Sequence, residues 1–355
     1  MARGSGHFSK LVEEMLKLSK VKEGERVIVV VPHVFEPRYV EAYTVALGNL
    51  GADFYVMTLA PRAEGHRLVL PASKFVYEAL RSADMVITLS LFEYDMAVPS
   101  TFYLIYGTNE GYSVLESGTR VLSVMEEEEV MRRMFPTEDL VRRSYAGAKL
   151  IEQAETIRVV SEAGTDLVCN KKGRPGSTEV GIADVPGRWD NFGYGLVGCA
   201  PLEDSAHGIL VIDSGDYIVP LYSHVTEPIK CTIRDGRIVR IEGGFSARLL
   251  ERWLAQWDDE RSFGLAHIGW GTHKAARWFD PRTRLPGYHI EKYSYYGNMA
   301  IAFGSNLMRS PARYCGLHGQ NDAPSHCDIF TLNHDFYLDG QLIVHRGEIV
   351  HPDCR

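Results

Sequence analysis

The chain has 355 residues, of which 45% are hydrophobic and 24% are charged, and its formal net charge is -8 at pH 7. The length suggests two domains of ordinary size, and the composition is typical of a globular protein with a full core. The acidic balance argues against a nucleic acid or an anionic membrane as partner, because no large basic surface is implied.

No stretch of the chain reaches the roughly 20 apolar residues that a membrane helix needs. Residues 1–5 contain no apolar core of a secretory signal. The 6 cysteines form no Cys-x-x-Cys pair, which is more typical of a reducing compartment than of a disulfide framework. We therefore expect a cytoplasmic location without membrane association, and we also expect a homo-oligomer.

The first part of the chain alternates between helical and strand-like segments. The run at 26–31 is rich in valine and isoleucine, which is typical of a strand buried on both faces. The order of segments predicts an α/β domain with a parallel sheet over residues 1–135. The expected helices are 8–20, 37–51 and 71–83, and the expected strands are 26–31, 53–59, 84–89 and 120–124.

This Rossmann-like domain lacks the loops that bind nucleotides. It contains neither Gly-x-Gly-x-x-Gly nor Gly-x-x-x-x-Gly-Lys-Ser/Thr, and its first strand runs into residues 32–37, which include two prolines. Such a segment does not cradle a phosphate in the usual way. We therefore predict that the domain has no nucleotide site.

A long amphipathic helix at 137–155 leads into a part of the chain dominated by strands. Residues 136–355 are expected to form a larger α+β, metal-binding domain rich in antiparallel strands. Two hairpins are predicted by Asp-Gly turns, the first over 228–242 and the second from strands 328–337 and 341–344. The other expected elements are strands at 157–160, 166–170, 208–213 and 217–221, and a helix at 245–257.

His326 and Asp328 form a His-x-Asp pair in this second domain. On a strand both side chains would lie on the same face, because strand side chains alternate with a period of two. A third ligand from a distant segment would be His267, which precedes a Gly-Trp-Gly turn. Two histidines and one aspartate suit iron(II), and also manganese or zinc. Spacing alone leaves open that all three are ordinary hydrogen-bonded residues.

Three segments resemble motifs of the aminopeptidase S/T metallopeptidases. Residues 192–208 are similar to their Pro-Asp-Gly-Glu-Val-Phe-Thr-Ala-Pro-x-Glu-Asp-Ser stretch, 265–271 to Leu-Ala-Glu-Leu-Gly-Phe-Gly, and 326–328 to His-x-Asp. Leu196 and His267 stand where the peptidases have metal-binding glutamates. The resemblance therefore implies that a two-metal site is lost and that one metal, held by two histidines and an aspartate, remains.

This single-metal pattern is similar to the 2,5-dihydroxypyridine 5,6-dioxygenase family, whose Pro-Gly-Arg-Trp segment is matched at 186–189. The resemblance implies a non-haem dioxygenase with Fe(2+) as cofactor. It implies cleavage of a hydroxylated pyridine or a related aromatic ring with O2, of the extradiol type. The alternatives are a metal-dependent aminopeptidase-like hydrolase and a noncatalytic metal-binding or scaffold protein.

Ring cleavage of this type needs a group that takes the proton of a ring hydroxyl, usually a histidine. The family is expected to have one just after the Arg-Trp segment, where this chain has Asn191. The candidate catalytic residues are therefore Asn191 and the loop residue His318, with His207, His273 and His334 as weaker alternatives. The expected substrate-binding residues are Ser305, Asn306, Trp189 and Tyr295. Tyr293, Tyr295 and Tyr296 form an aromatic cluster. This cluster is expected either to line a flat pocket or to belong to a β-strand core.

Overall fold

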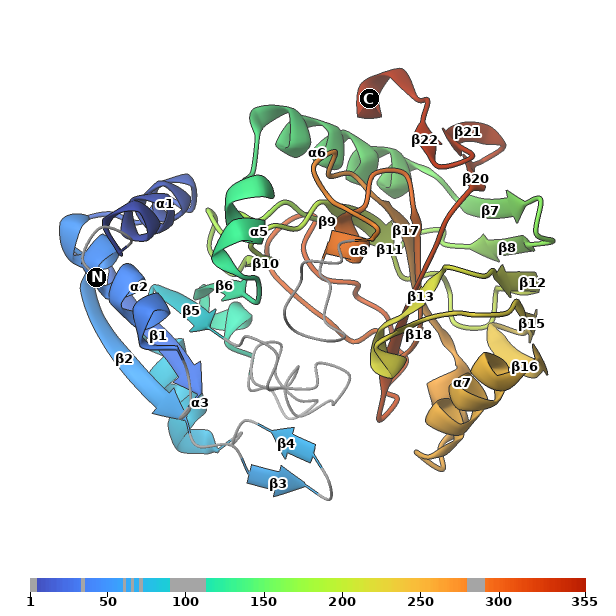
Figure 1. Ribbon diagram of the computed structural model, residues 1–355, viewed down its shortest axis with the longest axis horizontal. Coiled ribbons are helices and arrows are strands. Elements are labelled where there is room, and N and C mark those ends of the chain that lie inside the picture. Colours follow the sequence, from blue (N-terminus) through green and yellow to red (C-terminus); the bar gives the residue numbers. More distant parts are fainter. Residues whose placement is uncertain are drawn as a thin grey trace. The chain divides into compact units, whose positions relative to one another are not determined.

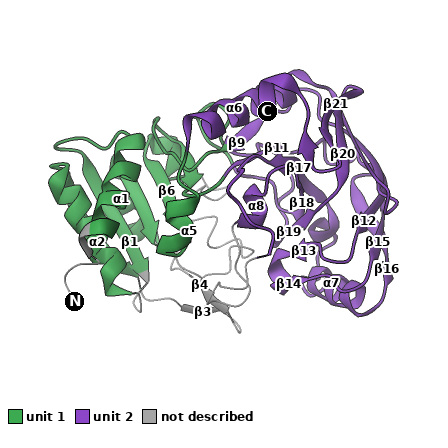
Figure 2. Cartoon of the chain, turned by 45° about the horizontal axis from the view of Figure 1, so that its top comes forward, with its two compact units in different colours: residues 1–136, 179–194, 309–315 green, residues 137–178, 195–308, 316–355 purple. Residues whose placement is uncertain are grey.

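The computed structural model describes residues 5–32, 36–59, 62–64, 67–69, 73–89, 113–279 and 291–355. They fall into two compact units, which Figure 2 distinguishes by colour. Unit 1 comprises Met1–Pro136, Glu179–Tyr194 and Arg309–Cys315, and unit 2 comprises Thr137–Thr178, Gly195–Met308 and Gly316–Arg355. The domain limits expected from the sequence, 1–135 and 136–355, stay a prediction.

Unit 1 contains a five-stranded sheet in the order β10-β6-β5-β1-β2, and all four of its strand pairings are parallel. The β-branched run of β1 lies in the middle of the core, where Val29 is fully buried. The predicted α/β fold with a parallel sheet is confirmed. The strands are β1 (Arg26–Pro32), β2 (Asp53–Leu59), β5 (Met85–Leu89), β6 (Arg120–Val124) and β10 (Trp189–Asn191).

Helices α1 (Ser5–Leu18) and α2 (Pro37–Asn49) pack side by side in unit 1 (Figure 1). Their apolar faces join β1 in one core cluster, where the rings of Phe8 and Tyr39 meet edge to face. The remaining elements described in this unit are α3 (Lys74–Arg81), α5 (Glu128–Arg133), the 3-10 turn Leu115–Ser117 and the ribbon of β3 (Arg62–Glu64) and β4 (Arg67–Val69).

Two larger sheets lie mainly in unit 2, and the strand pairings described in them are antiparallel, as predicted. The first has seven strands in the order β14-β13-β19-β18-β17-β11-β9. Its middle strands, β17 to β19, are buried along their whole length. The strands are β9 (Ser177–Glu179), β11 (Leu196–Cys199), β13 (Tyr217–Ile218), β14 (Ser223–His224), β17 (Leu265–Gly271), β18 (Met299–Gly304) and β19 (His326–Thr331).

The second sheet of unit 2 has eight strands in the order β16-β15-β12-β8-β7-β20-β21-β22. They are β7 (Thr156–Ser161), β8 (Asp166–Asn170), β12 (His207–Ile212), β15 (Ile229–Arg234), β16 (Arg237–Gly243), β20 (His334–Leu338), β21 (Gln341–His345) and β22 (Glu348–Ile349). The helices described in this unit are α6 (Glu138–Gln153), α7 (Phe245–Ala255) and α8 (Glu291–Ser294), with 3-10 turns at Val219–Leu221, Glu260–Phe263 and Pro352–Cys354.

The predicted strand at 328–337 is wrong, because the chain changes sheets within it. Strand β19 ends at Thr331 in the seven-stranded sheet, and β20 begins at His334 in the eight-stranded sheet. Between them Asn333 has a φ of 59°, a left-handed conformation that asparagine tolerates. The predicted hairpin is confirmed with a shorter first strand, because β20 and β21 pair on either side of the Asp-Gly turn. The strand expected at 217–221 ends at Ile218 and continues as a 3-10 turn.

The Gly-Trp-Gly segment after His267 was expected to form a turn. This prediction is wrong, because the segment is the second half of strand β17. Glycine is required there for close packing. A Cβ atom at Gly269 would overlap the carbonyl oxygen of Val197 on β11, and one at Gly271 would overlap that of Tyr295. A glycine-rich stretch therefore marks a crowded strand at this position.

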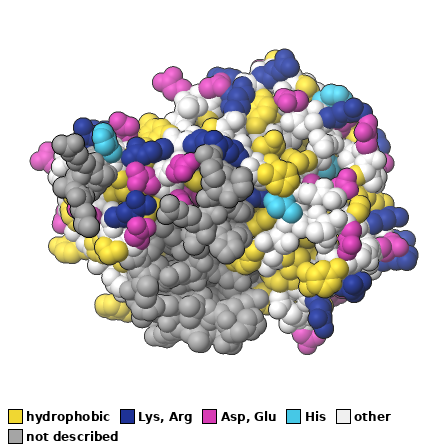
Figure 3. All heavy atoms as spheres, in the orientation of Figure 1, with side chains coloured by type: hydrophobic (Ala, Val, Ile, Leu, Met, Phe, Trp, Pro, Cys, Tyr) yellow, Lys and Arg dark blue, Asp and Glu magenta, His cyan; other side chains and the backbone are white. Residues whose placement is uncertain are grey.

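Charged side chains of both signs are interspersed on the face drawn in Figure 3, outside the grey atoms. This distribution agrees with the modest net charge of -8. Among the helices that the structure describes, none is both long and apolar enough to cross a membrane. The cytoplasmic location and the homo-oligomer stay predictions.

Candidate metal centre

Three neighbouring strands of the seven-stranded sheet bring the His-x-Asp pair and His267 together. Strand β18 lies between β17 and β19, and Ala302 on β18 is in register with both His267 and Asp328. Residues opposite one another in an antiparallel pair project to the same face of a sheet. His267 and Asp328 therefore lie on one face with Ala302 between them, and the single methyl group of Ala302 leaves space for their side chains.

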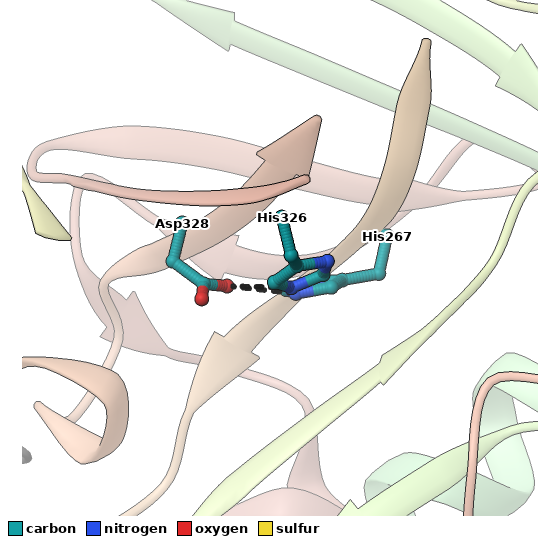
Figure 4. A group of neighbouring side chains, drawn as sticks. All are labelled: His267, His326 and Asp328. Atoms are coloured by element: carbon teal, nitrogen blue, oxygen red, sulfur yellow. Dashed lines mark hydrogen bonds and ion pairs between the residues drawn. The ribbon is translucent and has the colours of Figure 1, made fainter. Parts of the chain in front are cut away.

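The side chains of His267, His326 and Asp328 converge on one point (Figure 4). The Oδ1 atom of Asp328 lies 2.9 Å from Nε2 of His267 and 3.3 Å from Nε2 of His326. One potential ligand atom from each residue lies within 4.8 Å of the other two, and all three residues are buried. Among the described residues, this is the group of histidine, cysteine and carboxylate side chains whose geometry could hold a metal ion.

Two hydrogen bonds orient the side chains of the triad. Nδ1 of His326 lies 2.8 Å from the carbonyl oxygen of Ser305, and because a carbonyl only accepts, Nδ1 carries the proton. In the neutral ring, the lone pair of His326 is then on Nε2, which faces Asp328. The hydroxyl of Tyr293 donates to Oδ2 of Asp328 over 2.9 Å. Ligand side chains of metal sites are commonly held by outer partners of these kinds.

Burial and mutual attraction set the charges of the triad. Burial disfavours the ionised carboxylate of Asp328, but the two imidazoles outweigh it, and the pKa of Asp328 is well below its usual range. Burial lowers the pKa of His267 despite the nearby carboxylate. For His326 burial also acts to lower the pKa, but Asp328 and the Ser305 carbonyl outweigh it, so that its pKa is raised. Asp328 is therefore ionised in the folded protein, whereas the pKa values of the two imidazoles shift in opposite directions.

The segment after β18 places two of the expected substrate-binding residues. Ser305 contacts the triad through its carbonyl oxygen, as described above. Asn306 is fully buried, and its Oδ1 atom accepts from the backbone of Asn321 over 2.8 Å. Its amide nitrogen lies 3.3 Å from the carbonyl oxygen of Ala266, next to His267. These contacts hold the end of β18 against β17, while substrate binding by Ser305 and Asn306 stays a prediction.

Two other expected site residues lie on β10 in unit 1. The indole N–H of the buried Trp189 donates to the Ser123 hydroxyl over 3.0 Å, and the amide nitrogen of Asn191 donates to Glu179 over 3.0 Å. In unit 2 the ring of Tyr295 meets that of Trp278 edge to face, with centroids 5.3 Å apart. Roles in catalysis or substrate binding stay predictions for Asn191, Trp189 and Tyr295.

The candidate base His318 lies in a loop of unit 2, with a φ of 55°. Its carbonyl oxygen accepts from the guanidinium of Arg174 over 2.6 Å, so the loop backbone is fixed. The weaker candidates lie elsewhere in the fold. His207 is 58% exposed beside Asp235, Nδ1 of His273 accepts from the backbone of Ala275 over 3.2 Å, and His334 is buried at the start of β20.

Sequence reasoning did not find Tyr293 or Ala302 as residues of this site. Tyr293 was expected in a pocket wall or a strand core, yet it lies in the short helix α8 and hydrogen-bonds to Asp328. No motif marks Ala302, and the aromatic cluster that contains Tyr293 does not indicate a contact with Asp328. Only the strand register, which joins segments far apart in the chain, brings them to the triad.

Comparison with known proteins shows a relationship over nearly the whole chain. Residues 7–351 match the family model described as NicX, 2,5-dihydroxypyridine 5,6-dioxygenase. The chain belongs to this family. It is 34% identical to 2,5-dihydroxypyridine 5,6-dioxygenase of Pseudomonas putida KT2440, and the match covers 99% of each sequence. The resemblance inferred from the motifs is thereby confirmed.

Solved structures give the same relationship at the level of the fold. The structure of 2,5-dihydroxypyridine dioxygenase from Pseudomonas putida KT2440 matches with a TM-score of 0.84 and 31% identity, over 99% of each chain. Wild-type AmpT from Thermus thermophilus matches with a TM-score of 0.64 and 16% identity, over 97% of this chain and 99% of that one. At this identity the second match shows a shared fold alone.

Proposed function

We propose that this family member is an iron(II)-dependent dioxygenase that opens the ring of 2,5-dihydroxypyridine, or of a closely related hydroxylated pyridine, with O2. The iron ligands in this proposal are His267, His326 and Asp328. One observation carries it: two imidazole nitrogens and one carboxylate oxygen from distant parts of the chain lie within 4.8 Å of one another in a buried site. Full-length similarity to a dioxygenase of this kind supports the proposed reaction.

The chemistry of the three side chains fits a divalent metal ion. Two neutral imidazoles and one carboxylate are the donor set of non-haem iron(II) oxygenases, and the remaining coordination positions stay open. Nε2 of His326 is available because Nδ1 is occupied by the Ser305 carbonyl. When bound there, iron(II) would supply the redox chemistry that allows dioxygen to react with an electron-rich ring.

The protein's own groups would handle the charge and the proton of the substrate. The anionic Asp328 offsets part of the charge of a bound cation in a buried site, where electrostatic attraction is strong. A ring hydroxyl must lose its proton before cleavage. The base that accepts this proton is His318, in the loop before β19, or a basic group of the substrate itself. Asn191 serves as a hydrogen-bonding group in this proposal, since an amide cannot take a proton near neutral pH. Cleavage of the extradiol type belongs to the same proposal.

The alternative function is that of a metal-dependent aminopeptidase-like hydrolase, since the chain shares its fold with AmpT. Leu196 on β11 offers no ligand atom where the peptidase motif has a glutamate, and His267 replaces a second one. A bridged pair of metal ions therefore lacks part of its expected ligand set. Hydrolysis of leucyl amides by the pure protein, lost on chelation and restored by zinc, would favour the hydrolase over the dioxygenase.

The decisive experiment is anaerobic reconstitution followed by oxygen uptake. The purified apoprotein is loaded with Fe(II), Mn(II) or Zn(II), its metal content is measured, and each form receives 2,5-dihydroxypyridine, its positional isomers and catechol. We expect one metal ion per chain and oxygen uptake with dihydroxypyridines for the iron form alone. An iron-loaded protein that consumes no oxygen with any of these rings would overturn the proposal.

A further inference from the structure

The two oxygens of the Asp328 carboxylate have different partners. Oδ1 faces the two imidazole Nε2 atoms, at 2.9 Å from His267 and 3.3 Å from His326. Oδ2 points away from the imidazoles and accepts a hydrogen bond of 2.9 Å from the hydroxyl of Tyr293. A tyrosine hydroxyl keeps its proton at neutral pH and a carboxylate only accepts, so Tyr293 is the donor in this bond.

The hydroxyl of Tyr293 is held in place from several sides. Its ring meets that of Phe330 on β19 edge to face, with centroids 4.3 Å apart. The neighbouring Ser294 accepts from the backbone N–H of His273 over 2.8 Å through its carbonyl, and from that of Gly195 over 3.0 Å through its hydroxyl. Helix α8 is thereby tied to the chain just after β17 and just before β11, which limits the movement of the Tyr293 ring.

We propose that Tyr293 is a positioning residue that fixes the rotation of the Asp328 carboxylate, so that Oδ1 alone is presented to a metal ion. The inference rests on the proposed metal site and adds a residue to it. A carboxylate that turns freely can offer one oxygen or both, whereas one held at Oδ2 offers a single ligand atom. Held in this way, Asp328 leaves a further coordination position open for substrate or dioxygen.

Removal of the hydroxyl is expected to weaken metal binding without loss of the fold. Tyr293→Phe keeps the ring against Phe330 and deletes only the donor. Partners that orient a ligand in this way typically change metal affinity by about 10- to 100-fold. A second variant, with 4-aminophenylalanine at position 293, retains an N–H donor on the same ring and should recover most of the affinity.

The test titrates Co(II) into the apoprotein and follows the visible absorption bands, which depend on coordination number and geometry. The wild-type protein should bind one Co(II) per chain, and Tyr293→Phe should bind it at least tenfold more weakly with altered band intensities. A matched control is Tyr337→Phe, which also deletes a tyrosine hydroxyl that donates to a carboxylate, that of Asp335, over 3.3 Å in the other sheet. The control should bind Co(II) as the wild-type protein does.

Each outcome bears on a separate claim. Wild-type protein that binds no Co(II) would overturn the proposed metal site and the role of Tyr293 with it. Stoichiometric binding by the wild-type protein, with the same affinity and the same bands in Tyr293→Phe, would overturn the role of Tyr293 alone. If Tyr293→Phe unfolds at a lower temperature, recovery of binding in the 4-aminophenylalanine protein still supports the hydrogen bond, and failure to recover contradicts it.

Discussion

His267 and Asp328 are 61 positions apart in the chain, yet Nε2 of the one lies 2.9 Å from Oδ1 of the other. They sit on strands that do not touch, since β18 runs between β17 and β19. Two strand spacings amount to about 9.5 Å, so the two side chains must lean toward each other across the middle strand. This arrangement creates a buried group of ligand atoms above a position with a minimal side chain.

Replacement of Asp328 by asparagine should remove the metal and the activity. The amide has nearly the same shape as the carboxylate but carries no charge, and two imidazoles alone are a weak site. We expect Asp328→Asn to retain less than about 1% of wild-type oxygen uptake and no stoichiometric iron after gel filtration, with unchanged far-UV circular dichroism. Asp335→Asn, which alters a carboxylate bonded to His345, is the matched control and should keep its iron. Full activity of Asp328→Asn would exclude Asp328 as a ligand.

A second prediction concerns the space above Ala302. Ala302→Val adds two methyl groups between His267 and Asp328, which are the register partners of Ala302 on the two neighbouring strands. Overpacking of this size usually costs about 1–3 kcal/mol of stability. We expect metal affinity to fall at least tenfold, measured by Co(II) titration.

The control for that effect is Ala300→Val on the same face of the same strand. Ala300 is equally buried, but its register partners are Gly269 and Phe330, which carry no ligand atom. It should lose similar stability in thermal unfolding but much less Co(II) affinity than Ala302→Val, because Phe330 is linked to the triad only through Tyr293. Equal loss of binding by the two variants would mean that general strain in β18, rather than the space at Ala302, governs the site.

Local signals in the sequence predicted much of the fold. The β-branched run of β1 marked a buried strand, and the Asp-Gly turns marked both hairpins. The spacing of His326 and Asp328 indicated a shared face because it depends only on the period of a strand. Each of these features is encoded within a few residues, and for that reason a single sequence reveals it.

Long-range pairing could not be predicted in the same way. Strand β10 joins the parallel sheet of unit 1 from 65 residues beyond β6, counted from Val124 to Trp189. The glycines of β17 suggested a turn. Glycine is selected both where the chain packs closely and where φ is positive, so the sequence alone does not distinguish the two cases. The aromatic cluster drew attention to Tyr293 but gave no sign of its contact with Asp328, since its hydroxyl meets that carboxylate only through the tertiary fold.

Asn191 and His318 lead to a prediction about pH. Asn191 donates to Glu179 and does not titrate near neutral pH. Asn191→His should introduce a new inflection into the dependence of kcat/KM on pH, near the ordinary histidine value of about 6.5, or change the preferred ring. His318→Ala should slow the chemical step by about 10²-fold or more if His318 takes the proton.

Single-turnover kinetics with 2,5-dihydroxypyridine and its isomers would separate these effects from substrate binding. Asn191→Gln keeps the amide and is the control for a change of shape. A rate of ring cleavage that is unaffected by His318→Ala would contradict the role of His318.

The last prediction concerns stability at acidic pH. Burial lowers the pKa of His334 to about 4 from an ordinary value of 6.5, because the folded protein cannot hydrate the cation. As the pH falls below 6.5, the unfolded chain binds this proton before the folded one does, so the free energy of unfolding decreases. The decrease amounts to about 3 kcal/mol once the pH reaches 4, whereas above pH 7 the group contributes nothing.

His334→Asn removes that proton from the balance and should flatten the dependence of stability on pH. The apoprotein is unfolded with urea at pH 7, 5.5 and 4.5, and the midpoints are compared with those of the wild-type protein. The variant is expected to be less stable at pH 7, since it loses the contact of Nδ1 with the Thr331 hydroxyl at 3.2 Å, but to lose less stability on acidification. The control is His207→Asn, at a side chain that is 58% exposed. Its urea midpoint should change with pH as that of the wild-type protein does. An unchanged slope in His334→Asn would show that this histidine is not held neutral by the fold.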